Sequence, residues 1–86
     1  MESWQVGDVI YHGDIYTGFI DIFKILYLSI YSCSILVART ESLFTGTYNT
    51  ILISHDKNED IVFSDSIYSC NVNRVYEFIQ KHKASF

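Results

Sequence analysis

The chain has few cysteines and histidines, and none recurs at the spacing of a metal site. Two cysteines, Cys33 and Cys70, are too few for the disulfide framework of a small secreted domain. No CxxC or HxxxH pattern occurs, and Asp8, His12 and Asp14 are explained by an ordinary polar turn. We therefore expect no metal and two buried, inert, reduced thiols. A Cys33–Cys70 bridge stays open as the alternative.

Motifs that carry catalysis are also missing. No GxSxG element presents a nucleophilic serine, and Gly7, Gly13 and Gly18 do not precede a capped helix as a phosphate-binding loop would. The pair His55-Asp56 opens a polar stretch and is typical of a turn. These absences predict a protein that is not an enzyme and that has no cofactor.

Basic residues are scarce. Six Lys and Arg stand against ten Asp and Glu, so the net charge is −4, and residues 71–86 hold three of the six basic residues. Phosphate contacts need clustered Lys and Arg, so a nucleic-acid partner is not expected. An acidic surface instead suits a basic protein surface, or serves solubility alone.

The chain begins without the basic region of a signal peptide, since its first ten residues contain Glu2, Gln5 and Asp8. We therefore expect a cytoplasmic protein. A length of 86 residues predicts one domain, residues 1–86, and a 49% hydrophobic content allows a core that needs no metal.

Glycine, proline and asparagine are absent from residues 19–45, which leaves the apolar run Phe19–Ala38 open to three interpretations. Asp21 and Lys24 lie inside the run and argue against a membrane span. A buried helix would align its polar residues on one stripe, but the β-branched and aromatic content favours two strands, Phe23–Tyr31 and Ile35–Arg39. The pentapeptide Ser-Ile-Tyr-Ser-Cys occurs at residues 29–33 and 66–70, and predicts a turn near residues 32–34.

Two hairpins are expected outside that run. Val9–His12 and Ile15–Thr17 flank Gly13-Asp14, a two-residue turn that would place Tyr11 opposite Tyr16. Later in the chain, strands at residues 48–55 and 60–64 flank the polar loop 56–59.

The C-terminal region predicts a helix over residues 72–83. Asn71 is a suitable N-cap, and Val72, Val75, Tyr76 and Ile79 recur at helical spacing to form one apolar face, with Phe78 at its flank. Lys81, His82 and Lys83 follow where the negative end of the helix dipole favours cations.

Together these elements predict a single α+β domain: a small twisted antiparallel sheet of four to six strands, open or curled towards a barrel, with one C-terminal amphipathic helix. The chain is rich in tyrosine, and Tyr and Trp anchor protein interfaces. We therefore expect a non-enzymatic protein-binding module, a small inhibitor or adaptor that docks on a larger protein. The candidate anchors are Trp4, Tyr11, Asp14, Tyr16 and Tyr48.

Three alternatives stay open. A small β-barrel could bind single-stranded nucleic acid by stacking bases on tyrosine. The chain could be a small membrane protein, although a membrane partner is not expected. A homodimer could form through an exposed sheet edge. Small size and the Ile-, Tyr- and Asn-leaning composition would suit an accessory protein of a phage or mobile element.

Overall fold

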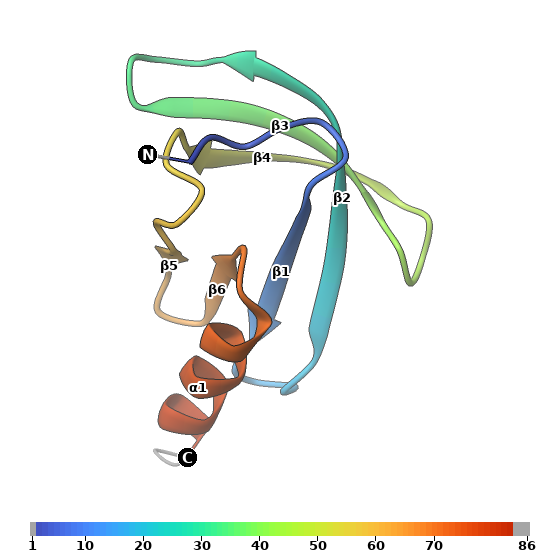
Figure 1. The fold of residues 1–86 in the computed structure, drawn as a ribbon. Coiled ribbons are helices and arrows are strands. Elements are labelled where there is room, and N and C mark those ends of the chain that lie inside the picture. Colours follow the sequence, from blue (N-terminus) through green and yellow to red (C-terminus); the bar gives the residue numbers. More distant parts are fainter. Residues whose placement is uncertain (1, 84–86) are drawn as a thin grey trace.

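A computed structural model describes residues 2–83 as a six-stranded antiparallel sheet followed by one helix (Figure 1). The elements in chain order are β1 (Val9–Asp14), β2 (Ile20–Ile30), β3 (Ile35–Ser42), β4 (Tyr48–Ser54), β5 (Ile61–Val62), β6 (Ser66–Ser69) and α1 (Val72–Lys83). In space the strand order is β4-β3-β2-β1-β6-β5. The sheet curls into a half-barrel, which confirms the predicted α+β class, the strand number and the barrel-like curvature.

The apolar run forms β2 and β3, so the prediction of two strands joined by a turn is confirmed. Burial alternates strictly along β3, where Leu36, Ala38, Thr40 and Ser42 face inward, as a strand with one covered face requires. A single continuous helix, whether buried or membrane-spanning, is therefore wrong for this run. Within residues 2–83, no helix combines the length and the apolar character that crossing a membrane requires.

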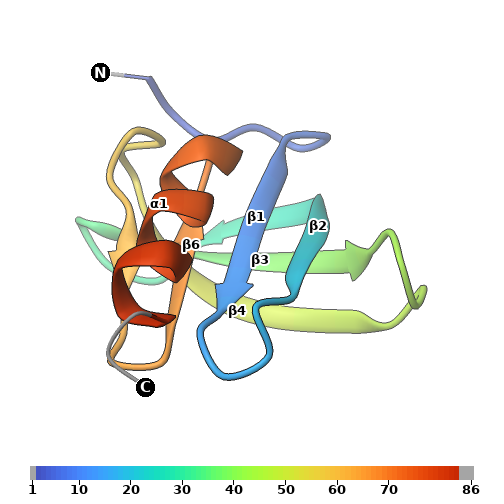
Figure 2. The same ribbon diagram turned by 90° about the horizontal axis from the view of Figure 1, so that it is seen from below.

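Two clusters of buried side chains lie on opposite faces of the sheet. The inner cluster fills the curl of the half-barrel and comprises Trp4, Ile10, Phe23, Ile25, Leu36, Ala38 and Ile53. The second lies between the sheet and α1 and comprises Ile15, Ile67, Val75, Phe78 and Ile79. Figure 2 shows α1 lying across β1 and β6, so the helix covers only one end of the sheet.

The predicted helix is confirmed, with its cap. The Asn71 side-chain oxygen accepts a hydrogen bond from the Asn73 backbone N–H at 2.9 Å. The predicted apolar face needs one correction: Tyr76 is 55% exposed, and Phe78 takes its place beside Val75. The helix approaches β1 so closely that the buried face of the strand has room only for glycine, at Gly13.

The first predicted hairpin has the wrong turn. Gly13 and Asp14 continue β1, which pairs with β2 as far as Gly13 opposite Ile20. The chain reverses after Asp14, whose carboxylate accepts the Tyr16 N–H at 2.7 Å, and Gly18 supplies the positive φ of 69°. The predicted placement of Tyr11 opposite Tyr16 is therefore wrong. Gly13 is needed because it leaves room for the approach of α1. The sequence Gly13-Asp14 resembles a turn and does not reveal this role.

The second predicted hairpin contains two real strands that do not pair with each other. β4 pairs with β3, and β5 pairs with β6. The polar loop therefore connects the two ends of the sheet instead of closing a hairpin. An isolated bridge between Ser3 and Asp56, and a hydrogen bond from Lys57 N to Glu2 O at 2.9 Å, tie this loop to the N-terminal segment.

The repeated pentapeptide does not mark a structural duplication. Its second copy forms β6, whereas its first copy ends β2 and enters the turn predicted near residues 32–34. The thiol prediction also needs a correction: Cys33 is exposed in that turn, and Cys70 is half-buried. Both cysteines are free.

Candidate functional site

β4 is a terminal strand of the sheet, with β3 on one side only. Hydrogen bonds from Ser42 N to Thr47 O and from His55 N to Ser34 O, at the two ends of this pairing, show which opposite residue pairs of the ladder are hydrogen-bonded. Because hydrogen-bonded and non-bonded pairs alternate along an antiparallel ladder, Asn49, Ile51 and Ile53 bond to β3. The backbone N–H and C=O groups of Tyr48, Thr50, Leu52 and Ser54 are directed to the open side.

β4 lacks the charges, the proline and the bulge that usually protect a sheet edge. Its seven residues, YNTILIS, include no charged residue and no proline. Its pairing with β3 runs without a bulge from Glu41 opposite Tyr48 to Ile35 opposite Ser54. Natural proteins blunt edge strands with lysine, proline, bulges or covering segments, because a bare edge is a template for another strand.

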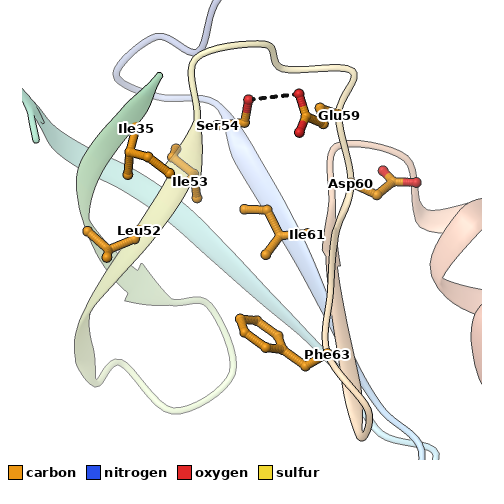
Figure 3. Close-up of a pocket in the computed structure, with 8 residues that line it drawn as sticks. All are labelled: Ile35, Leu52, Ile53, Ser54, Glu59, Asp60, Ile61 and Phe63. Atoms are coloured by element: carbon orange, nitrogen blue, oxygen red, sulfur yellow. Dashed lines mark hydrogen bonds between the residues drawn. The ribbon is translucent and has the colours of Figure 1, made fainter. Parts of the chain in front are cut away.

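An apolar cleft of ≈ 360 Å³ runs beside this edge. Figure 3 shows it between β4 on one side and the chain of β5 on the other. Its lining residues are Ile35, Leu52, Ile53, Ser54, Glu59, Asp60, Ile61 and Phe63. The cleft is open to solvent, since Leu52 is 50% exposed and Phe63 is 52% exposed. Its size is at the lower end of the range for ligand sites.

The loop end of the cleft is acidic. Glu59 accepts a hydrogen bond from the Ser54 hydroxyl at 3.2 Å (Figure 3). The charge of Asp60, in contrast, is balanced by a cation: its Oδ2 lies 3.2 Å from Arg74 Nε. Its Oδ1 accepts a hydrogen bond from the Ser69 hydroxyl at 2.6 Å. The Arg74 N–H is close enough for an ion pair but is not aimed at the oxygen as a hydrogen bond requires. Glu59 has no such cation among the ion pairs of the described residues.

The loop that keeps the two sheet ends apart is itself anchored. Lys57 Nζ lies 3.2 Å from the Asp8 carboxylate and 5.7 Å from the centre of the Trp4 ring. Half-exposed contacts of this kind contribute modestly one by one. Combined with the backbone bridge from Ser3 to Asp56, they tie the loop to the N-terminal segment.

A histidine stacked against two aromatic rings lies on the inner face of the sheet. His12 stacks on Tyr68, with ring centres 4.5 Å apart, and on Phe23 at 6.0 Å. Burial lowers the pKa of His12, against the opposing charges of Asp14, Asp21 and Asp65. Burial also raises the pKa of Tyr68, and Asp65 and Asp21 add to that rise. Burial among these rings therefore favours the neutral form of the His12 imidazole.

The five anchors predicted from sequence are scattered. Trp4 is buried in the inner cluster, and Tyr11 packs against the cluster under α1. Asp14 caps the β1–β2 turn, where Tyr16 is 71% exposed. Tyr48 is 62% exposed and is the one predicted anchor on the β4 edge.

The sequence prediction missed the residues that line the cleft. Leu52, Ile61 and Phe63 lie in the two segments, 48–55 and 60–64, that were predicted to pair as a hairpin, so no cleft between these segments was predicted. A signal was present in the uncharged segment 48–54, since its composition matches that of strands prone to pair with other strands. Such a segment suits a central strand equally well, so only the topology shows that it is an edge.

Comparisons of the chain with protein-family models, with curated proteins and with solved structures found no match in any of the three. The candidate site therefore depends on the geometry of this chain alone.

Proposed function

We propose that the chain is a non-enzymatic protein-binding module that docks on a larger protein through the open β4 edge and the cleft beside it. The observation that carries this proposal is the bare edge of β4: seven residues without charge, proline or bulge, next to an apolar cleft. Such an edge is an aggregation hazard unless a partner covers it.

The composition of the site supports a protein partner over other classes. Leu52, Phe63 and Tyr48 supply half-exposed apolar and aromatic surface of the kind found at the centre of protein interfaces. The negative charge of the Glu59 carboxylate at the cleft would repel the phosphate backbone of a nucleic acid. A binding module of this kind would serve as a small inhibitor or adaptor.

A photo-crosslinking amino acid tests the proposal in cells of the source organism. It is placed at Leu52 in the cleft, at Tyr16 in the β1–β2 turn, and at Tyr76 on the outer face of α1. We expect a discrete protein adduct from position 52 and none from position 76, which has similar exposure, 55% against 50%. An adduct with nucleic acid, or protein adducts from positions 16 or 76 alone, would refute the proposal.

A further inference from the structure

The β4 edge restricts the conformation of whatever covers it. Tyr48, Thr50, Leu52 and Ser54 direct backbone groups to the open side, and no backbone partner for those of Tyr48, Thr50 and Leu52 is found among residues 2–83. A partner helix satisfies its own backbone groups and would leave these unpaired. An extended chain supplies alternating N–H and C=O groups at the same spacing, which is the geometry of strand addition.

The walls of the cleft restrict the side chains of that extended chain. On the β4 side the cleft is lined by Leu52 and by the buried Ile53, which point to opposite faces of the strand, and on the other side by Ile61 and Phe63. Successive side chains of a strand point to opposite faces. An occupant paired with β4 would therefore place every second side chain between these walls, where apolar residues fit.

The loop end of the cleft restricts the charge of the occupant. Glu59 lies there with only the Ser54 hydroxyl as a described side-chain partner, whereas Asp60 is already paired with Arg74. A Lys or Arg at the matching end of the occupant would complete an ion pair with Glu59. Charge complementarity therefore favours a basic residue at that end.

The same charge argument disfavours a second copy of this chain as the occupant. In a symmetric edge-to-edge dimer, the strand entering the cleft would be β4, which contains no Lys or Arg. The Glu59 carboxylate would then stay without a cation, and two chains of net charge −4 would be brought together.

We propose that the cleft binds an extended segment of a partner protein, which adds as a strand to the β4 edge with alternating apolar residues and a Lys or Arg beside Glu59. This inference rests on the proposed function and specifies its partner. Seven residues of strand span about 24 Å at 3.4 Å each. So small an interface is expected to bind with roughly micromolar affinity.

A displayed library of random twelve-residue peptides, selected against the whole chain, tests this proposal. Enriched peptides are expected to alternate apolar residues and to carry Lys or Arg at one end. A synthetic peptide from the selection is then methylated at one backbone nitrogen at a time. The loss of binding affinity should recur at every second position along the peptide. Methylation at positions facing β4 should weaken binding about tenfold or more, and methylation at the intervening positions should change it little.

Two variants test the role of charge. Glu59→Gln should weaken binding of the selected peptide by about two- to fivefold, and this loss should vanish when the basic residue of the peptide is replaced by glutamine. Asp65→Asn, at the exposed turn between β5 and β6, is the matched control and should leave affinity unchanged. Equal effects of the two variants would overturn the assignment of the basic residue.

The remaining outcomes also decide the proposal. Enrichment of proline-rich or helical peptides, an absence of enrichment, or a methylation pattern without a two-residue period would overturn strand addition. A dimer in sedimentation that Leu52→Lys dissociates would show that a second copy is the occupant. The crosslink from position 52 tests the proposed function, independently of the peptide experiments. A protein adduct there without strand-like peptides would reject this inference and leave the proposed function standing.

Discussion

Gly13 in β1 offers the sharpest test of how α1 is seated on the sheet. A Cβ at this position would penetrate Val75 Cγ1 and would lie 3.1 Å from Ile79 Cδ1. Val75 is fully buried and β-branched, so it cannot turn away within the helix. The φ of Gly13 is not positive, so the substitution Gly13→Ala introduces a packing clash without backbone strain.

The expected cost follows from these contacts. Overpacking a buried site costs about 1–3 kcal/mol, and the reduced freedom of the unfolded chain offsets about 0.4–1 kcal/mol of that. Gly13→Ala should therefore lower the free energy of unfolding by about 1–2 kcal/mol. In a domain of 86 residues, each kcal/mol corresponds to about 4–8 °C in melting temperature.

A double-mutant cycle with Val75→Ala identifies the cause. Val75→Ala alone should cost about 1.5–3 kcal/mol for two lost methyl groups and the cavity they leave. In the double variant the new methyl group at position 13 occupies part of that cavity, so the summed costs should exceed the measured cost by about 1 kcal/mol or more.

Urea unfolding followed by circular dichroism measures all members of the cycle. Gly18→Ala is the matched control, because Gly18 has a φ of 69° and nothing within 4 Å of a new Cβ. Its cost of about 1–2 kcal/mol comes from backbone strain and should be additive with Val75→Ala. Additivity of Gly13→Ala with Val75→Ala would refute the close seating of α1.

Two further predictions concern single side chains. Because burial lowers the pKa of His12 below its ordinary value of 6.5, the unfolded chain binds this proton more readily, and stability should fall as the pH drops below 6.5. His12→Phe keeps the stacking and should make urea unfolding less dependent on pH in this window, whereas an unchanged dependence would contradict the assignment. At the start of α1, Asn71→Ala should cost about 1 kcal/mol through loss of the cap to Asn73, and Asn71→Asp should cost nothing, since it keeps the cap and adds a negative charge to a first turn that has none. Equal stability of the alanine and aspartate variants in thermal unfolding would show that the cap contributes nothing.

Local patterns in the sequence predicted the elements whose signals are local. The helix over residues 72–83 follows from a cap and a period of 3.6 residues, both contained in the segment itself. The division of the run Phe19–Ala38 into β2 and β3 follows from its β-branched and aromatic content. These properties act over a few residues and do not depend on the rest of the fold.

The errors concern contacts between segments far apart in the chain. Gly13 resembles a turn residue until α1, some sixty residues later, is packed against it. Strands at β4 and β5 were expected to pair because a polar loop joins them, but β5 pairs with β6 and β4 with β3. The cleft exists because of that alternative pairing, so Leu52 and Phe63 could not be identified as a site from composition.

Amide hydrogen exchange along β4 tests the central claim most directly. In the free protein, the amides of Asn49, Ile51 and Ile53 should be protected by β3, and those of Thr50 and Leu52 should exchange rapidly at the open edge. Binding of a selected peptide should slow exchange at Thr50 and Leu52. Protection of these two amides in the free monomer, or no change on binding, would contradict the account of β4 as an open edge that receives a strand.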